Sequence, residues 1–185
     1  MHYFTKIELA KLLAYAFETN RRNHALLLSS VCHGLRVSEV LQLRGNDYQG
    51  ENLVVRRSKG GKNSLQAIYK SKNPVWDESQ IPKLVPRPDN LLFPITRQQV
   101  DAIIKRYGLA CGIPRAKLHA HTLRHTCAHF VYEKSKSLAQ VQQVLGHRSP
   151  ATSLIYLAES QESAGIMSLQ DSLQDCAKTE LNDQS

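Results

Sequence analysis

Apolar residues recur at helical spacing through most of the chain, and capping residues mark where the helices begin. Three segments, Thr5–Glu8, Thr96–Gln99 and Ser137–Gln140, have the pattern of a capping box, in which two side chains bind free N–H groups of the first helical turn. Each is followed by apolar residues three and four positions apart, which is typical of a helix with one buried face. Predicted helices cover about residues 5–17, 23–32, 37–43, 97–107, 121–134, 138–145, 150–157 and 168–181.

The hydrophobic period changes between residues 53 and 94. Leu53–Val55 is a short β-type run, and Leu65–Tyr69 alternates between apolar and polar residues. Lys59–Lys62, with two glycines at its centre, is expected to be the tip of a hairpin that joins them. Residues 71–94 contain five prolines, which lack the N–H donor of a strand, so we expect an irregular segment there. The predicted fold class is α+β, mostly α-helical with one small antiparallel β-sheet.

Composition limits the class of protein. A chain of 185 residues is long enough to bury a core without disulfides or metals. The four cysteines are scattered with no C-x-x-C pair, which indicates reduced thiols in a cytoplasmic protein. No stretch approaches the roughly 18 apolar residues of a membrane span, and Met1–Lys6 lacks the basic and apolar regions of a signal peptide. We therefore expect no membrane partner.

The charge is strongly positive, with 24 Lys and Arg against 16 Asp and Glu and a formal net charge of +8. Solubility alone can explain such an excess, and so can a polyanionic partner such as nucleic acid. Basic residues cluster at Arg56–Lys62, whereas acidic residues gather late in the chain. The candidate DNA-binding residues are Arg56, Arg57, Lys62 and Arg148.

Six further polar residues suggest chemistry when they are taken together, although each alone has an ordinary explanation as a surface ion pair, a core side chain or a solvated turn. Guanidinium groups match phosphate oxygens in geometry and charge, and they stabilise the pentavalent transition state of phosphoryl transfer. A tyrosine hydroxyl, with a pKa of about 10, needs cations and a base such as histidine to become a nucleophile. The six residues are Arg36, Lys59, His121, Arg124, His147 and Tyr156.

The same residues, in this order and spacing, resemble the catalytic domain of the tyrosine recombinases, the phage-integrase family. The matching segments are HGLRVSEVLQL, RRSKGGKNS, HAHTLRHTCAHF and VQQVLGHRSPATSLIYLA. The resemblance covers about residues 5–158, nearly the whole chain. It implies the DNA breaking-rejoining fold of that family and one mechanism of DNA strand exchange.

In the implied mechanism, Tyr156 attacks a DNA phosphate to give a 3′-phosphotyrosyl link and a free 5′ hydroxyl. The implied phosphate-binding and activating residues are Arg36, Arg124, His121 and His147. Lys59 is the implied general acid, and Lys62 is the alternative for that role. The bond energy stays in the phosphotyrosine, so the resemblance implies no ATP, metal or other cofactor. It also implies double-stranded DNA as partner and self-association into dimers or tetramers on that DNA.

For domain organisation, we expect a single catalytic domain over residues 1–185, with a core at about 5–158 and a C-terminal tail at 159–185. Members of the family usually carry an N-terminal core-binding domain that clamps the other face of the DNA, and we expect this domain to be absent from the chain. The chain is then either a fragment or a compact version. The tail packs either onto a neighbouring protomer or back onto its own domain.

Three alternatives differ from a recombinase. Residues 137–157 have the pattern of two helices around a turn, which suits a noncatalytic DNA-binding module that would not need Tyr156. A type IB topoisomerase-like activity would use the same chemistry to relax DNA without exchanging partners. A zinc site is the third, but no cysteine pair or carboxylate completes a tetrahedral set near its candidate ligands, so we expect no metal. Those ligands are His119, His121, His125, Cys127 and His129.

Overall fold

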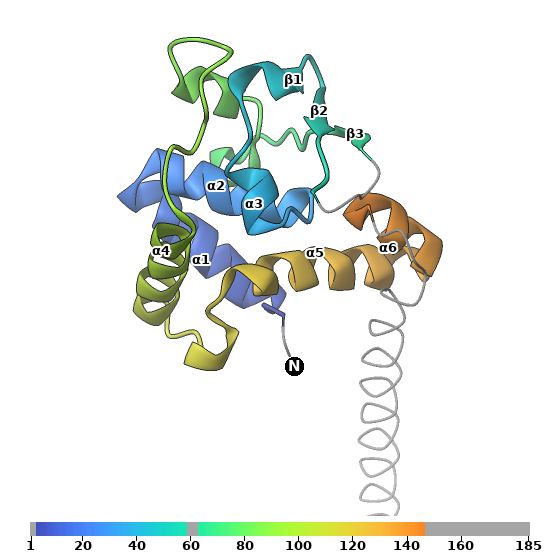
Figure 1. The fold of residues 1–185 in the computed structure, drawn as a ribbon. Helices are drawn as coiled ribbons and strands as arrows, with labels where there is room; N and C mark the ends of the chain where they lie inside the picture. Colours follow the sequence, from blue (N-terminus) through green and yellow to red (C-terminus); the bar gives the residue numbers. More distant parts are fainter. Residues whose placement is uncertain (1–2, 59–62, 147–185) are drawn as a thin grey trace, which may run out of the picture.

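The computed structural model describes residues 3–58 and 63–146. Figure 1 shows the strands at one end of the molecule, with α2 and α3 in the middle and α5 crossing below them. The α-helices are α1 (Lys6–Thr19), α2 (Arg21–Cys32), α3 (Val37–Val40), α4 (Arg97–Ala110), α5 (Ala120–Ser135) and α6 (Leu138–Leu145). The strands are β1 (Tyr48–Gln49), β2 (Asn52–Val55) and β3 (Ser64–Ala67). Short 3₁₀ helices in the connections are η1 (Gly45–Asp47), η2 (Pro74–Trp76), η3 (Ile81–Leu84) and η4 (Arg115–Lys117). Among the helices of the described ranges, none has the length and apolar character needed to cross a bilayer.

The predicted helix starts are confirmed by their capping contacts. At the start of α1, the Thr5 hydroxyl accepts the Glu8 N–H at 3.1 Å, and the Glu8 carboxylate accepts the Thr5 N–H at 2.7 Å. Thr96 makes the same reciprocal pair at the start of α4. Ser137 begins α6 by accepting the Gln140 N–H at 3.4 Å, but its own N–H donates to the Ser135 hydroxyl at 3.1 Å, so only half of the predicted capping box forms. These contacts satisfy donors that have no partner inside the helix, which is why the residue pattern locates each start.

Four helix boundaries differ from the prediction by two or more residues. α1 ends at Thr19 rather than at residue 17. α2 begins two residues early, because Asn20 caps it by accepting the Asn23 N–H at 3.0 Å. α3 ends at Val40 rather than at residue 43. α4 continues through Gly108 to Ala110, because this glycine serves close packing rather than helix termination. A Cβ atom there would lie 2.2 Å from Leu118.

The sheet is antiparallel with strand order β1-β2-β3, which confirms the predicted pairing of the segments around residues 53–55 and 65–69. β2 and β3 are in register with Leu53 opposite Gln66 and Val55 opposite Ser64. β1 was not predicted, since two residues are too short to show a period. Residues 71–94 contain η2 and η3 and no strand, as the prolines predicted. The tip at Lys59–Lys62 lies outside the described residues, as do the predicted helices after residue 146.

Two apolar clusters hold the helices together. The larger one joins α1, α2, α4 and the start of α5 with the sheet. The smaller one packs α6 on the second half of α5, through buried Cys127, Ala128, Tyr132, Val141 and Leu145. The C-terminal end of α6 is thereby held close to the end of α2 and the start of α3. This junction contains the polar residues considered next.

Candidate active site

The loop between α2 and α3 carries the first predicted site residue. Gly34 has φ of +56°, a left-handed conformation that favours glycine, and Leu35 is buried. Arg36 then forms the N-cap of α3, and its side chain is 25% exposed. Its backbone N–H and its Nη1 donate to the two oxygens of the Glu39 carboxylate, at 2.9 and 2.8 Å. The short helix therefore fixes both the backbone and the guanidinium of Arg36.

Glu39 is the centre of this arrangement and is completely buried. Besides Arg36, its carboxylate accepts from Arg57 Nη1 at 2.9 Å and from the Ser58 N–H and hydroxyl at 3.1 and 3.3 Å. Burial on its own would raise the pKa of Glu39, but the hydrogen bonds from Arg36 and the charge of Arg57 outweigh it and hold the pKa below the ordinary value. Glu39 is thus an anion surrounded by donors.

The prediction that Arg57 binds DNA is wrong. Its side chain is 0% exposed, so it cannot contact DNA. Its guanidinium donates to Glu39, to the His33 carbonyl at 3.1 Å and to the Val144 carbonyl at the end of α6. Burial lowers the pKa of Arg57, and the nearby Glu39 carboxylate opposes that shift. Arg56, its neighbour, is 61% exposed and paired with Asp47. Of the two adjacent arginines, only Arg56 has an exposed side chain.

Arg124 lies in the second turn of α5 and is almost fully buried. It donates to the Gly34 carbonyl, and to the Leu145 carbonyl at 2.9 Å. Its Nη1 lies 3.9 Å from the Glu39 carboxylate. Arg124 therefore ties the α2–α3 loop to the last turn of α6. Three guanidinium groups, those of Arg36, Arg57 and Arg124, surround one carboxylate and leave a net charge of +2.

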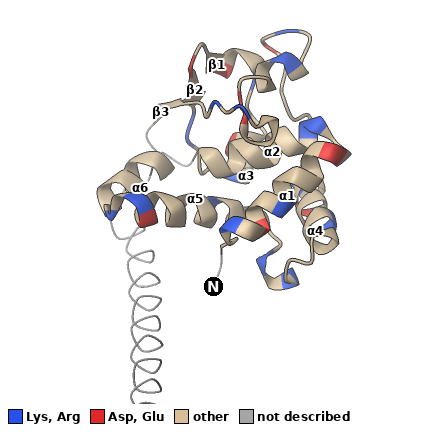
Figure 2. Cartoon of the chain, turned by 180° about the vertical axis from the view of Figure 1, so that it is seen from behind, with Lys and Arg blue, Asp and Glu red and all other residues tan. Residues whose placement is uncertain are grey.

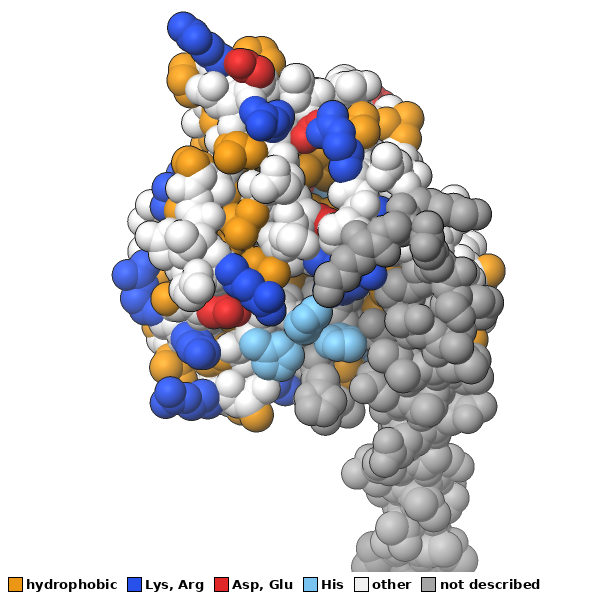
Figure 3. Space-filling model, viewed as in Figure 1, with side chains coloured by type: hydrophobic (Ala, Val, Ile, Leu, Met, Phe, Trp, Pro, Cys, Tyr) orange, Lys and Arg blue, Asp and Glu red, His pale blue; other side chains and the backbone are white. Residues whose placement is uncertain are grey.

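His121 lies one turn before Arg124 on α5 and is exposed. Its ring centroid is 6.5 Å from that of His125. Partial burial lowers the pKa of His121, as do the positive charges of His119, Arg97, Arg124 and Arg36. Figure 3 shows histidine side chains grouped on this face, beside Lys and Arg. The structure thus brings Arg36, His121 and Arg124 together, as the sequence predicted, with His121 favoured as the neutral imidazole.

Five predicted residues lie outside the described residues and stay predictions: Lys59, Lys62, His147, Arg148 and Tyr156. The chain on either side of them is anchored at the cluster. Ser58, next to Lys59, binds Glu39, and the Arg57 N–H donates to Asn63 at 2.9 Å. Before His147, the carbonyls of Val144 and Leu145 accept hydrogen bonds from Arg57 and Arg124.

The sequence missed Glu39 as the centre of the site and Arg57 as its buried partner. A partial signal for Glu39 was present in the sequence, because a glutamate three residues after an N-cap commonly accepts the N-cap N–H, as Glu39 does from Arg36. No signal distinguished Arg57 from Arg56. For metals, the described residues contain no group of three or more His, Cys, Asp or Glu that could hold an ion. The expectation that the protein needs no metal is not tested by this.

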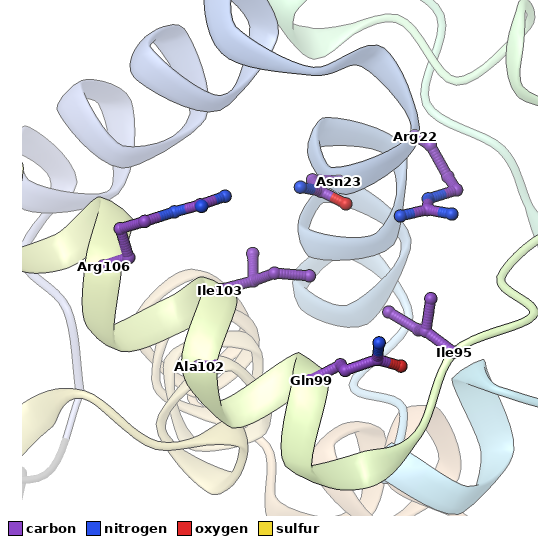
Figure 4. Close-up of a pocket in the computed structure, with 7 residues that line it drawn as sticks. All are labelled: Arg22, Asn23, Ile95, Gln99, Ala102, Ile103 and Arg106. Carbon is purple, nitrogen blue, oxygen red and sulfur yellow. The ribbon is translucent and has the colours of Figure 1, made fainter.

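Basic residues and hollows elsewhere do not compete with this site. Figure 2 shows Lys and Arg spread over several helices and loops rather than confined to one stripe. A hollow of about 280 Å³ between α2 and α4 contains none of the predicted site residues (Figure 4). Its buried Asn23 amide donates to the Tyr107 hydroxyl at 2.8 Å, while the amide oxygen has no partner among the described residues. Its lining residues are Arg22, Asn23, Ile95, Gln99, Ala102, Ile103 and Arg106.

Gly34→Ala is expected to destabilise the protein by roughly 2–4 kcal/mol, through strain at positive φ and overpacking. A Cβ atom would lie 2.4 Å from the buried Leu145 and 3.2 Å from Cys127 Sγ. Gly50→Ala is the matched control, because Gly50 also has positive φ but an added Cβ would meet nothing within 4 Å. The control should cost only about 1 kcal/mol. Urea unfolding of both variants measures the difference, and equal losses would contradict the packing argument.

Comparison with known proteins identifies the family. The model of the Phage integrase family matches residues 2–163. A tyrosine recombinase of Pseudothermotoga lettingae is 33% identical over 155 residues, which cover 81% of this chain and 54% of that protein. The tyrosine recombinase XerH of Campylobacter jejuni is 32% identical over 167 residues, covering 83% of this chain and 47% of that protein.

A solved structure agrees with these relatives. The XerH site-specific recombinase bound to palindromic difH substrate, in a post-cleavage complex, superposes with a TM-score of 0.68 at 26% identity. The match covers 90% of this chain and 53% of that one. The chain thus spans about half the length of the curated relatives named above. The fold and motifs agree with those expected from the sequence, and the chain belongs to the phage integrase family.

Proposed function

We propose that the chain is the catalytic domain of a site-specific DNA recombinase that breaks and rejoins DNA strands through Tyr156. The observation that carries this proposal is the cluster of Arg36, Arg57 and Arg124 around the buried Glu39, with His121 beside it. Its net positive charge and its partly exposed Arg36 suit an oxyanion with two oxygens to bind, which is the chemistry of a phosphodiester.

In the reaction, the Tyr156 oxygen forms a bond to phosphorus while the bond from phosphorus to the 5′ oxygen breaks. The phenol loses its proton to a base, and the departing 5′ oxygen takes one from an acid. The free 5′ hydroxyl of a partner strand then reverses these steps and restores a phosphodiester and the phenol. Bond count is conserved in each step, so the reaction needs neither ATP nor an oxidant.

The described residues have separate parts in this scheme. The Arg36 side chain donates one hydrogen bond to Glu39, and a guanidinium has five N–H donors, so donors remain for a phosphate oxygen. Arg124 adds positive charge close by. His121, favoured as the neutral imidazole, accepts the phenol proton or donates a hydrogen bond to the phosphate. Lys59 is the proposed general acid, with Lys62 the alternative, and His147 is the second proposed histidine.

The proposal extends to partners and organisation. The partner is double-stranded DNA, contacted also by Arg56, Lys62 and Arg148. Strand exchange joins two DNA sites, so protomers act in pairs, as dimers or tetramers on DNA. We assign the catalytic core to about residues 5–158 and a tail to 159–185. Cys32, Cys111 and Cys127 are free thiols, which supports action in the reducing cytoplasm.

The test is formation of a covalent protein–DNA adduct. The protein is mixed with a pool of random-sequence duplexes, each carrying a nick that lets the cleaved fragment diffuse away and traps the intermediate. We expect a detergent-resistant adduct, with the DNA attached to the peptide that contains Tyr156. DNA binding with no adduct would favour the noncatalytic module. An adduct accompanied by plasmid relaxation without exchange between two sites would favour the topoisomerase-like alternative.

Arg36→Ala is expected to slow adduct formation roughly 100- to 1000-fold, the usual cost of removing a group that stabilises charge in a transition state. DNA affinity should fall only modestly, because many other basic residues bind the backbone. Arg56→Ala is the control, since Arg56 is exposed and lies outside the cluster. Its effect should fall on affinity and leave the rate at saturating DNA unchanged. Equal losses of rate and affinity in Arg36→Ala would indicate a structural role.

A further inference from the structure

A second buried acid–base pair, His33 and Glu78, lies behind the candidate active site. His33 is the C-cap of α2, directly before Gly34, and Glu78 lies between η2 and η3. Their side chains are 2% and 0% exposed, and His33 Nε2 lies 3.0 Å from Glu78 Oε1. Neither residue has a part in the proposed chemistry. Buried groups of this kind are costly unless every polar atom is satisfied, so their partners show what they do.

The hydrogen bonds of Gln66 determine whether Nδ1 of the His33 ring carries a hydrogen. The Gln66 amide nitrogen donates to the Val144 carbonyl at 3.0 Å. Because a carbonyl only accepts, the Gln66 atom that faces Val144 must be the amide nitrogen. The Gln66 atom that lies 3.0 Å from His33 Nδ1 is therefore the amide oxygen. An amide oxygen cannot donate either. His33 Nδ1 therefore carries a hydrogen that it donates to Gln66.

The same argument applies to the second ring nitrogen. The other oxygen of Glu78, Oε2, accepts the Tyr69 N–H at 2.8 Å, which leaves Oε1 to face His33 Nε2. If His33 Nε2 carried no hydrogen and Glu78 were ionised, two lone pairs would face each other at 3.0 Å, which is repulsive. A proton therefore lies between Nε2 and Oε1. The pair holds this one proton in common and has no net charge.

This pair connects the segments that position the arginines. The carbonyl of His33 accepts from Arg57, and the carbonyl of Gly34, the next residue, accepts from Arg124. Gln66, bound to the His33 ring, reaches the Val144 carbonyl at the end of α6, where Arg57 also donates. The ring of His33 thus joins α2, β3, α6 and the 69–78 segment at the point where the α2–α3 loop begins.

We propose that His33 and Glu78, through their shared proton, are positioning residues that hold the α2–α3 loop, and with it Arg36, in the geometry for strand cleavage. This inference rests on the proposed function. Both side chains are buried, 2% and 0% exposed, so neither is placed to bind a DNA phosphate. Loss of the pair should therefore lower the rate of cleavage at saturating DNA rather than the affinity for DNA.

Three variants of the pair test the proposal. Glu78→Ala and His33→Ala each leave a buried partner unsatisfied, and we expect adduct formation to slow roughly 10- to 100-fold, the cost of misplacing a catalytic group by about 1 Å. Glu78→Gln should restore most of the wild-type rate. Its carbonyl accepts the Tyr69 N–H, and its NH₂ donates to His33 Nε2, so every hydrogen bond is kept without the shared proton.

The rates are measured on the full chain with excess nicked DNA, beside the dissociation constant for DNA and the melting temperature. Gln66→Ala removes the hydrogen bonds from the His33 ring to Gln66 and from Gln66 to Val144. It replaces the first two variants in the test if alanine at position 33 or 78 prevents folding. Gln49→Ala, at an exposed glutamine of the same sheet, is its control. Wild-type rates in folded Glu78→Ala, or a Glu78→Gln variant as slow as Glu78→Ala, would overturn the proposal, as would parallel loss of affinity.

A readout independent of cleavage separates this inference from the proposed function. The shared proton is buried and should give a slowly exchanging, downfield signal in the proton NMR spectrum of the wild-type protein, removed by His33→Ala. Its absence from the wild-type spectrum would overturn the proposal. If wild-type protein shows the signal but forms no adduct with any DNA, the proposed function fails while the pair itself stands.

Discussion

Tyr156→Phe is expected to abolish the covalent adduct and leave DNA affinity unchanged. The substitution removes only the hydroxyl oxygen, which is the atom proposed to bond to phosphorus. The arginine cluster around Glu39 remains, so the proposed phosphate-binding site is kept while the proposed nucleophile is lost. Loss of a nucleophile in enzymes of this general kind lowers turnover by a factor on the order of 10⁴ or more. Denaturing gels after incubation with nicked duplex measure the adduct.

The matched control for that experiment is Tyr69→Phe. Tyr69 is an exposed tyrosine whose backbone N–H, rather than its hydroxyl, binds Glu78. This variant should form adduct at the wild-type rate. An adduct that persists in Tyr156→Phe would show that another side chain attacks the phosphate. The proposed mechanism would then be wrong, even though the family membership stands.

Glu39→Gln is expected to destabilise the fold by about 3–5 kcal/mol, the usual result of removing one partner from a buried ion pair. All the groups that face Glu39 are donors, from Arg36, Arg57 and Ser58. A glutamine replaces one acceptor oxygen with an NH₂ group, which would point at a donor, and it leaves three guanidinium groups without their anion. Urea unfolding at neutral pH measures the loss.

The dependence on pH has a defined sign. The pKa of Glu39 is lower in the folded protein than its ordinary value, so the carboxylate stabilises the fold above the ordinary pKa of glutamate, about 4.3. That stabilisation is lost as the pH falls through the lowered folded pKa. The difference in the free energy of unfolding between wild type and Glu39→Gln should therefore be largest at neutral pH and should decrease in acid. A difference that widens in acid would contradict the assignment.

Two other glutamates serve as controls. Glu51 makes an exposed ion pair with Lys70, and Glu51→Gln should leave stability unchanged within error, because water screens such pairs. Glu78→Gln should be tolerated although Glu78 is buried. Its partner His33 can give up a proton and become an acceptor, whereas the arginines around Glu39 can only donate. The same substitution thus distinguishes three environments.

The helices were predictable because their determinants lie within a few residues of one another. The Thr5 and Thr96 capping boxes, for example, join residues only three positions apart. The pattern gave a wrong helix boundary where a contact with a residue distant in the sequence decided the role of a glycine. Gly108 was expected near the end of a helix, but it lies inside α4 because Leu118 packs against its backbone. Strand β1 has two residues, and its existence depends on pairing with β2 rather than on its own sequence.

The sequence by itself determined the helical fold class, the pairing of the two strands and the family, and it predicted Arg36, His121 and Arg124 as site residues. Order and spacing along the chain carry that information. Only the tertiary structure decided which charged groups lose their water. Arg57 is buried and Arg56 exposed because Glu39, 18 residues away, and the carbonyls at the ends of α2 and α6 all accept from the Arg57 guanidinium. Burial depends on partners brought together from distant parts of the chain, and local spacing does not record it.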